Sequence, residues 1–240
     1  MKQNDHDTIF ASSNQFKSAI KIIRISGTHA KKISNIFNFR KSKPRMFALR
    51  KLVYKDNVID HAPVMWLPKR KSFTGEDTYE IYIHGSIVIE KMIYKILSSH
   101  KNFRLAEPGE FTKRAVINGN IDLVQAESIN EIINAQTEKQ LTIAQAQLDG
   151  SLSSVVNNWR KEIIYISSLI ESLIDFSDED IPKELSKLFR KKLDNIRNKI
   201  KDAVNSAELS SFIKEGFTVT IVGKPNVGKS SLINALTKLN

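Results

Sequence analysis

Residues 223–231 read GKPNVGKSS, and they have the residue types and the spacing of a loop that binds phosphate. The pattern G-x-x-x-x-G-K-[ST] is satisfied by Gly223, Gly228, Lys229 and Ser230. Glycines allow backbone angles at which successive N–H groups turn inward and surround an anion. Lys229 can reach the outer phosphates of a nucleotide, and the hydroxyl of Ser230 can ligate Mg²⁺. The stretch therefore predicts a site for a nucleoside triphosphate.

The segments on either side are those that such a loop requires. FTVTIV, just before it, is rich in β-branched residues and predicts a buried strand. SLINALTKL, just after it, has the apolar spacing of a helix, whose N-terminus adds a positive dipole end to the anion site. A strand, a loop and a helix in this order begin an α/β P-loop domain. An accidental glycine-rich turn is the alternative interpretation.

The region before the loop is predicted to be almost wholly helical. Apolar residues at steps of three and four predict one helix from Thr137 to Asp175. Gly150 interrupts the pattern, but one glycine costs a helix only about 1 kcal/mol, so the helix is expected to continue. A second helix follows, with one apolar face, and the two leave part of an apolar stripe uncovered. The other face of the second helix is basic and carries Lys187, Arg190, Lys191, Lys192, Arg197, Lys199 and Lys201.

The first half of the chain mixes strand-like and helix-like segments. SAIKIIRIS and TYEIYIHG are typical of strands, and in the second Tyr79, Ile81 and Ile83 alternate with polar residues. MFALRKLVY and VIDHAPVMWLP flank residues 55–57, which predicts a hairpin turn. SIVIEKMIYKILSSH has helical spacing. We therefore expect a multidomain chain: an α+β domain over 1–118, a mainly helical domain over 119–213, and the first strand, loop and helix of an α/β P-loop domain over 214–240.

Composition narrows the class of protein. The 240 residues include no cysteine, which excludes disulfides and thiolate metal sites. The polar N-terminus MKQNDHDT lacks the apolar core of a signal peptide, and the most apolar stretch is too short to cross a membrane. We expect a soluble cytoplasmic protein. The net charge of +11 indicates either a Lys-rich coding bias or an anionic partner such as RNA.

Specific strings are distributed along the whole chain. They are DTIFA, RISG, SFTGED, RLAEPGEFTKRA, DLVQAE and IDFSDEDI, and the P-loop follows them. In this order and spacing the chain resembles the N-terminal half of the bacterial and organellar tRNA modification GTPases known as MnmE or TrmE. The resemblance implies a folate-binding-like N-terminal domain that forms a homodimer. It also implies a GTPase domain inserted in the helical domain.

The resemblance further implies a function. Members of the family act with a flavin-dependent partner, MnmG (GidA). Together they add an aminomethyl or carboxymethylaminomethyl group to C5 of the wobble uridine of certain tRNAs. The one-carbon unit comes from a 5-formyl- or methylene-tetrahydrofolate. GTP hydrolysis depends on K⁺ and Mg²⁺.

The family's site residues can be carried over by position. The nucleotide would contact Gly223, Asn226, Val227, Gly228, Lys229, Ser230 and Ser231, with Asn226 as the K⁺ ligand and Ser230 as the Mg²⁺ ligand. Folate would contact Arg24, Glu80 and Asn120. An arginine suits the carboxylate tail of folate, and a glutamate suits the N–H edge of a pterin. The family usually has lysine where this chain has Asn120, and a Pro- and Gly-rich loop where it has SSNQFKSA.

Three hypotheses follow. The sequence ends at Asn240, before any switch threonine, D-x-x-G or N-K-x-D segment, so it is expected to be a truncated GTPase that does not turn over GTP alone. The alternative is a non-catalytic module for folate binding or dimerisation. The third, another P-loop GTPase with an RNA-binding extension, is disfavoured by the strings in the first half.

Overall fold

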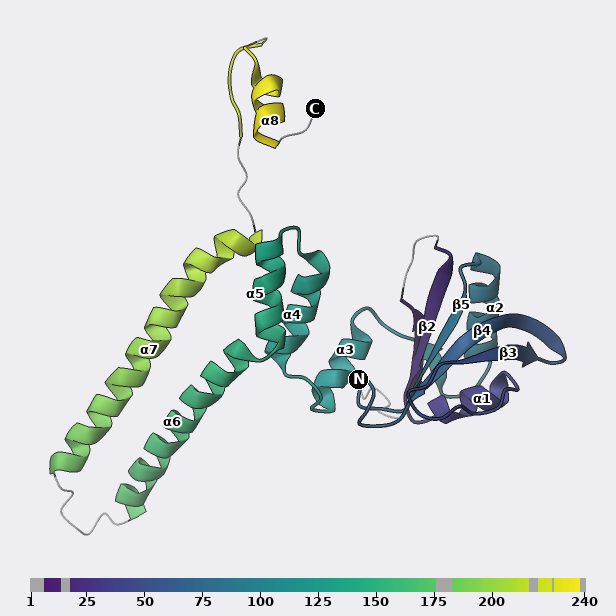
Figure 1. Ribbon diagram of the computed structural model, residues 1–240. Coiled ribbons are helices and arrows are strands. Elements are labelled where there is room, and N and C mark those ends of the chain that lie inside the picture. The colour runs from purple at the N-terminus through teal and green to yellow at the C-terminus, as the bar shows by residue number, and fades with distance from the viewer. Residues whose placement is uncertain (1–6, 14–17, 176–182, 216–219, 226, 238–240) are drawn as a thin grey trace. The chain divides into compact units, whose positions relative to one another are not determined.

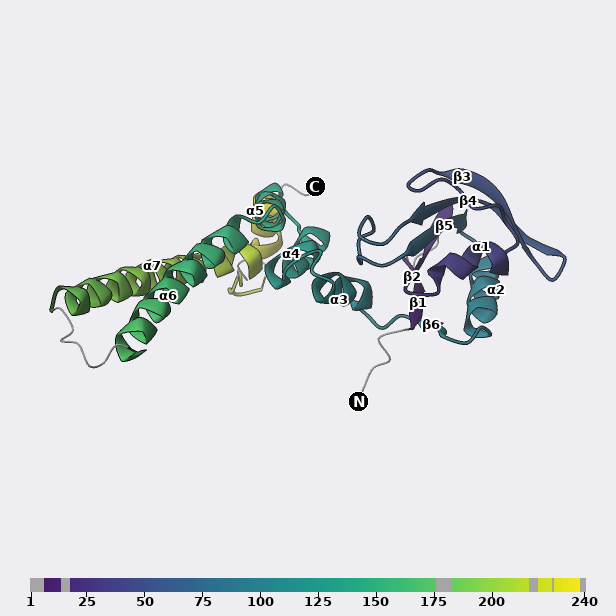
Figure 2. The ribbon, with the colours of Figure 1, turned by 90° about the horizontal axis from the view of Figure 1, so that it is seen from below.

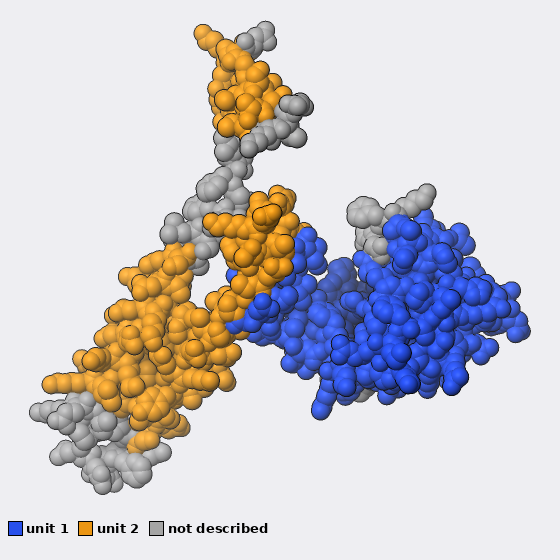
Figure 3. All heavy atoms as spheres, in the orientation of Figure 1, with its two compact units in different colours: residues 1–133, 147–150 blue, residues 134–146, 151–240 orange. Residues whose placement is uncertain are grey.

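The computed structural model describes residues 7–13, 18–175, 183–215, 220–225 and 227–237. Two compact units divide the chain, and they comprise residues 1–133 with 147–150 (unit 1) and residues 134–146 with 151–240 (unit 2) (Figure 3). The sheet lies in unit 1, and the long helices lie in unit 2 (Figure 1).

Unit 1 is built on one mixed sheet with the strand order β3-β4-β5-β2-β1-β6. The strands are β1 (Thr8–Ser12), β2 (Ile20–Ser26), β3 (Ala48–Tyr54), β4 (Asn57–Leu67), β5 (Thr78–His84) and β6 (Phe103–Leu105). Only β1 and β6 pair in parallel. The expected hairpin is confirmed: Lys55 and Asp56 join β3 to β4 with φ angles of 47° and 65°, the conformation that a two-residue hairpin turn requires.

One face of the sheet carries the hydrophobic core. The alternation predicted in β5 is confirmed, because Tyr79, Ile81 and Ile83 are all buried. They pack among core residues from the helices that cover this face, namely η1 (Ala30–Lys32), α1 (Ile33–Ile36) and α2 (Ile87–Ser98) (Figure 2). The hydroxyl of Ser86 caps α2 by accepting a hydrogen bond from the backbone of Val88 at 3.2 Å.

The opposite face of the sheet is polar. Arg24 pairs with Glu80, and Ser26 pairs with Thr78, between β2 and β5. The loop from residue 68 to 77 and helix α3 (Glu110–Ile117) reach this face through hydrogen bonds. The Ser26 hydroxyl lies 2.6 Å from that of Thr74 and donates to Glu76 at 2.8 Å.

Two arginines hold α3 against the strands. Arg104 donates to both oxygens of Glu110, at 2.8 and 2.6 Å. Arg114 donates to Glu76, to Glu110 and to the backbone oxygen of Asp7, at 3.2, 3.2 and 2.9 Å. Glu110 is only 5% exposed, so its charge depends on these partners. Burial alone raises its pKa, but the hydrogen bonds from Arg104, the Glu107 N–H and Arg114 together lower the pKa of Glu110 to about 2.

The prediction of one helix from Thr137 to Asp175 is wrong. The helices in this region are α4 (Leu123–Asn134), α5 (Glu138–Leu148) and α6 (Ser151–Asp175). Gly150 adopts a φ of +90°, and its N–H donates to the backbone oxygen of Gln147 at 3.0 Å. A glycine in this left-handed conformation closes a helix C-terminus, so the residue acts as a cap and not as a weak point inside a longer helix.

Unit 2 contains a hairpin of two long helices. Helix α7 (Lys183–Glu215) lies beside α6 in both views (Figures 1 and 2). Ile166, Phe189 and Ile196 are buried, whereas Leu193 and Val204 are 45% and 54% exposed. The apolar stripe is therefore partly uncovered within the described residues, as the pattern predicts. In that part of the chain, none of the helices is both long and apolar enough to cross a membrane.

The end of the chain contains the expected loop and helix, α8 (Lys229–Thr237). The strand expected over 217–222 is described only from Thr220 onward. Residues 220–222 have no hydrogen-bonded neighbouring strand in the described part of the chain and are not assigned as a strand. A β-strand is defined by its ladder, so this segment can become one only beside a partner.

Glu110 makes unit 1 sensitive to acid. Its carboxyl titrates near pH 4.5 when free and near pH 2 when folded, so the unfolded chain binds more protons between these values and stability falls with falling pH. Glu110 should account for about 2 kcal/mol of the free energy of unfolding lost between about pH 6 and about pH 3. The free energy of unfolding of the wild type should therefore exceed that of Glu110→Gln by about 2 kcal/mol less at pH 3 than at pH 6.

Trp66 can report this unfolding by fluorescence in a Trp159→Phe background, during urea titration at both pH values. Glu127→Gln, an exposed carboxylate on α4, is the control and should leave the pH dependence unchanged. Equal pH dependence in wild type and Glu110→Gln would contradict the role of Glu110.

Candidate functional site

The polar face of the sheet brings Arg24 and Glu80 together. They are register partners on β2 and β5, and both therefore project from the face opposite the core. The Nε atom of Arg24 donates to Oε1 of Glu80 at 2.9 Å, and Nη2 lies 2.8 Å from the same oxygen. Glu80 is 7% exposed, whereas the side chain of Arg24 is 34% exposed. Two of the residues predicted to bind folate are thus in direct contact.

Two aromatic rings lie close to the guanidinium of Arg24. Its Cζ atom is 6.0 Å from the ring centroid of Phe73 and 5.8 Å from that of Phe111. Phe73 comes from the loop between β4 and β5, and Phe111 comes from α3. Each cation–π contact contributes on the order of 0.5–1 kcal/mol and orients the guanidinium.

Tyr82 completes the environment of Glu80. Its hydroxyl donates to Oε2 of Glu80 at 2.8 Å, so each carboxylate oxygen has one partner. Burial raises the pKa of Tyr82 most. The hydrogen bond to Glu80 and the negative charge of that carboxylate raise this pKa further, to about 12. The phenol is therefore a neutral donor at physiological pH. The ring of the exposed Phe47 lies 4.9 Å from that of Tyr82.

Asn120 lies next to this cluster but does not contact Arg24 or Glu80 in the described structure. Its amide nitrogen donates to the backbone oxygens of Ser72 and Phe73, at 2.9 and 3.1 Å. The side chain therefore fixes the loop that carries Phe73. An amide can donate two hydrogen bonds, and both are used here.

A pocket of about 400 Å³ opens beside Arg24. Phe111 and Tyr94 line it, and so does the segment from Leu105 to Gly109. Arg24 has five N–H donors, and within the described residues only Nε and Nη2 have a protein acceptor. The remaining donors, with two aromatic rings nearby, can bind a ligand that combines a flat ring system with a carbonyl or carboxylate group.

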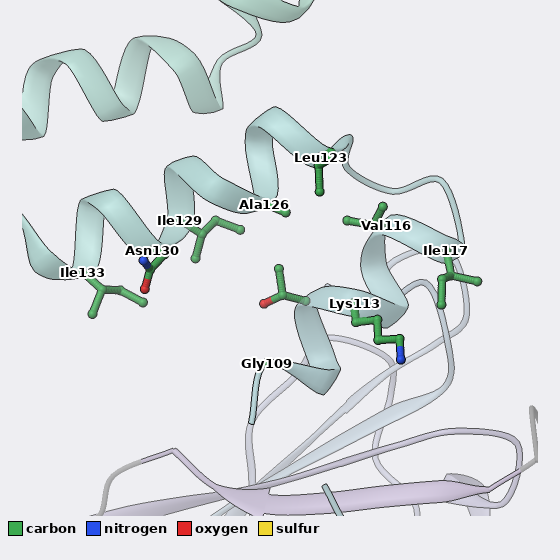
Figure 4. A pocket seen from close by; sticks show the side chains of 10 residues that line it. Gly109, Lys113, Val116, Ile117, Leu123, Ala126, Ile129, Asn130 and Ile133 are labelled. Carbon is green, nitrogen blue, oxygen red and sulfur yellow. The ribbon is translucent and has the colours of Figure 1, made fainter. Parts of the chain in front are cut away.

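A second pocket, of about 600 Å³, lies between α3 and α4 (Figure 4). Its walls are mainly apolar, and Val116, Leu123 and Ile129 point toward the space between the two helices (Figure 4). Lys113 is its only titratable lining residue. This pocket has apolar surface to bury but no pair of groups that could transfer a proton.

In the P-loop, the side chain of Lys229 is hydrogen-bonded to the backbone of the loop itself. The Nζ atom of Lys229 donates to the backbone oxygens of Gly223 and Lys224, at 3.0 and 2.7 Å. Gly228 has a φ of +86°, which only glycine adopts readily, and α8 begins at the next residue. The first N–H groups of α8 have no helical partner, so they can bind phosphate once Lys229 exchanges its carbonyl contacts for an anion.

The predicted nucleotide residues are only partly positioned. Val227, Ser230 and Ser231 are exposed around the start of α8. Asn226, the predicted K⁺ ligand, lies outside the described residues. The hydroxyl of Ser230 is accessible for Mg²⁺ binding.

Sequence reasoning missed Tyr82, Phe73 and Phe111 as members of the Arg24 cluster. Tyr82 could have been found, because it follows Glu80 by two positions on a strand and so projects from the same face. The two phenylalanines lie in the strings SFTGED and GEFTKRA, but no spacing rule connects a loop and a helix with a strand so far away in sequence.

Comparison with known proteins gives two adjacent matches. The family described as "GTP-binding protein TrmE N-terminus" matches residues 8–120, and the "MnmE helical domain" matches residues 123–237. The chain belongs to the MnmE (TrmE) family. The first match contains Arg24, Glu80 and Asn120, and the second contains the P-loop.

Relatives agree along almost the whole chain. The tRNA modification GTPase MnmE of Rickettsia canadensis (strain McKiel) is 40% identical over 234 residues, which are 96% of this chain and 53% of the relative. That of Rhodopseudomonas palustris (strain BisB18) is 40% identical over 235 residues, with 96% and 52% covered. The chain thus spans about half the length of these curated MnmE proteins.

The Arg24–Glu80 pair is expected to be energetically coupled. Arg24→Ala leaves a nearly buried carboxylate without its cation and should cost about 2 kcal/mol of unfolding free energy, less than for a fully buried pair because Arg24 is partly exposed. In a double-mutant cycle with Glu80→Gln, the coupling should be about 1–2 kcal/mol. Urea unfolding monitored through Trp66 measures it.

Lys31 and Asp77 provide the matched control, because the side chain of Lys31 is 58% exposed in that ion pair. Their coupling should stay below about 1 kcal/mol. If the effects of Arg24→Ala and Glu80→Gln on the free energy of unfolding were additive, the two side chains would be close together without stabilising each other.

Proposed function

We propose that unit 1 of this MnmE-family chain binds a reduced folate at the Arg24 cluster, in the service of tRNA modification. The observation that carries the proposal is the convergence of an incompletely paired arginine, a buried carboxylate and two aromatic rings, of which Arg24 and Phe111 also line an open pocket. Folate has a flat pterin ring with N–H donors at one end and a carboxylate tail at the other. Glu80 suits the N–H edge of the pterin. Because Arg24 contacts Glu80 at 2.8 Å, the free N–H donors of Arg24 suit the carbonyl of the same pterin ring and not the distant tail.

The residues have complementary roles in this proposal. Arg24 contributes positive charge in a partly desolvated setting, where a charge-assisted hydrogen bond is stronger than in water. Phe73 and Phe111 offer surfaces for ring stacking. Tyr82 orients Glu80 by donating a hydrogen bond to its Oε2 atom, and Asn120 fixes the backbone next to Phe73. The substrate would be 5-formyl- or methylene-tetrahydrofolate.

The P-loop is proposed to bind GTP through residues 223–231, with Lys229 on the phosphates. Ser230 would ligate Mg²⁺, which supplies charge neutralisation when it is bound, and Asn226 would ligate K⁺. Residues 1–240 contain neither a D-x-x-G nor an N-K-x-D segment, so GTP hydrolysis by these residues alone is not part of the proposal.

The domain boundaries are also part of the proposal: an α+β domain over residues 1–118, a helical domain over 119–213 and the start of a P-loop domain over 214–240.

The partners follow from the same proposal. The tRNA substrate would be modified at its wobble uridine together with the flavoprotein MnmG, in the cytoplasm. A homodimer would form over the polar sheet face, because Leu49 and Phe47 on that side are 68% and 58% exposed. An exposed apolar group beside a binding cluster is typical of an interaction surface.

A second candidate function is a folate-binding or dimerisation module without nucleotide turnover. The observation that favours it is the position of Lys229, whose ammonium group is bound to loop carbonyls. The two functions share the folate site and differ in the P-loop, so the folate experiment tests what they have in common.

Isothermal titration with 5-formyltetrahydrofolate should give measurable heat with the wild-type chain. Arg24→Ala should weaken binding at least about 10-fold, because it removes a charge-assisted contact worth about 1.5–3 kcal/mol. Asn120→Lys should tighten binding by about 10-fold, since it adds a positive charge beside the cluster and its ammonium can still donate to the loop carbonyls.

Arg40→Ala, an exposed arginine outside the cluster, is the control and should bind as the wild type does. An absence of heat from both wild type and Asn120→Lys would mean that the cluster does not bind folate. Equal affinity in Arg24→Ala and wild type would place the ligand elsewhere.

A further inference from the structure

One face of helix α7 carries a row of basic side chains that the folate and nucleotide sites do not use. Lys187, Arg190, Arg197 and Lys201 follow one another at steps of three, seven and four residues, with Asp194 between the arginines. Residues at such steps lie on one side of an α-helix. We call these four residues the basic row.

The basic row borders the apolar seam of the hairpin, and Arg190 and Arg197 line the edge of the groove between α6 and α7 with Ile163. The buried residues Phe189 and Ile196 do not share the row's side of the helix, and Arg197 lies about a quarter-turn from them. All four members of the row are exposed. The row is therefore accessible along its length within unit 2, where α6 lies beside α7 (Figures 1 and 2).

Two of the other basic residues of α7 have partners in the described structure. Lys199 pairs with Glu162 of α6 at 2.9 Å, and the ammonium of Lys192 lies 4.8 Å from the ring centroid of Tyr165. In the row itself, Arg197 contacts Asp194 at 3.0 Å, and both side chains are more than half exposed. An exposed pair of this kind is worth less than about 1 kcal/mol, so Arg197 can exchange it for another anion. For Lys187, Arg190 and Lys201 the described structure contains no ion pair.

The charge imbalance is concentrated on this helix. From residue 187 to 206 there are seven basic and two acidic side chains. The row extends over about 21 Å at about 1.5 Å per residue, so its four charges average about one per 5.4 Å turn. A linear array of cations with this extent matches a linear array of phosphates.

The composition of the row favours RNA over an acidic protein. A stable protein interface needs apolar or aromatic anchors at its centre, and the row contains none. Phosphate contacts instead come from exposed lysine, arginine and amide side chains, and Asn198 lies between Arg197 and Lys201 on the same side of the helix.

We propose that the exposed basic face of α7, through Lys187, Arg190, Arg197 and Lys201, binds the phosphate backbone of RNA. The identity of that RNA as tRNA rests on the proposed function. The contact itself is electrostatic and independent of base sequence, so it would position the RNA and not select it.

The test uses the full chain and a fluorescein-labelled tRNA transcript, with fluorescence anisotropy at about 50 to 200 mM KCl. The row variant combines Lys187→Gln, Arg190→Gln, Arg197→Gln and Lys201→Gln, and glutamine preserves helix propensity. Its affinity should fall at least about 10-fold at the lower salt concentration. The slope of log K against log salt should become shallower by about 3, because four phosphate contacts are lost.

The control variant removes the same amount of charge from exposed positions in unit 1, through Arg40→Gln, Lys41→Gln, Lys91→Gln and Lys95→Gln. It should bind RNA within about 2-fold of wild type. Equal losses in the two variants would overturn the proposal, since net charge alone would then account for binding. Unchanged RNA binding in the row variant would overturn the proposal too. If that variant then lost binding to polyglutamate instead, the basic row would be a site for an acidic protein and not for RNA.

Folate titration on the row variant separates this inference from the proposed function. The row variant should bind 5-formyltetrahydrofolate as the wild type does, because the row lies outside unit 1. Equal RNA affinity in the row variant and the wild type, or equal losses in the row and control variants, with folate binding intact in each, overturns only the inference about α7. Absent folate binding in the wild type overturns only the proposed function of unit 1.

Discussion

The ion pairs of Arg114 hold together the parts of unit 1 that form the candidate site. This arginine contacts the backbone oxygen of Asp7 just before β1, Glu76 in the loop after β4, and Glu110 in its own helix. Its side chain is 12% exposed, and that of Glu110 is 5% exposed. Charges this well buried are stable only when each has its partner, so the loss of one contact disturbs the others. The loop and α3 are thereby fixed on the polar face of the sheet.

The position of the aromatic rings beside Arg24 follows from this network. Phe73 is next to Thr74, whose hydroxyl lies 2.6 Å from that of Ser26, and Ser26 also donates to Glu76. Phe111 is the second residue of α3, adjacent to Glu110. When Arg114 and Arg104 hold Glu76 and Glu110, they also set where the two rings can lie. The electrostatic network is structural, and the proposed binding chemistry is carried by the residues that it positions.

Much of unit 1 can be predicted from the sequence because its strands alternate clearly. The alternation in TYEIYIHG places Glu80 on the face opposite the core, and the strand at residues 20–26 places Arg24 there as well. The proximity of Phe73 and Phe111 could not be predicted in this way. It depends on contacts such as Arg114 to Glu76 and Ser26 to Glu76, across 38 and 50 residues, and these have no periodic signature. Family resemblance was needed to select Arg24 and Glu80 from the many surface charges.

Two other residues show where local reasoning is insufficient. Helix propensity alone makes Gly150 a small cost inside a longer helix, whereas its left-handed conformation makes it the end of a helix. The sequence suggests Asn120 only as a ligand donor, whereas its amide donates to the backbone carbonyls of Ser72 and Phe73. In both cases the decisive property is a backbone contact that residue type alone does not specify.

The side-chain N–H signal of Arg24 gives the most direct test of the central claim, that Arg114 sets the environment of Arg24. In a ¹H–¹⁵N spectrum, the nearby rings should shift the signal of the Nε proton of Arg24. This proton should exchange slowly with water because it is hydrogen-bonded to Glu80. The signal is assigned by its absence in Arg24→Lys. In Arg114→Lys, the account predicts that this proton moves toward its free position and exchanges faster, while the methyl signals of Ile23, Ile81 and Ile93 in the core remain. An unchanged Arg24 signal in a folded Arg114→Lys protein would contradict the account.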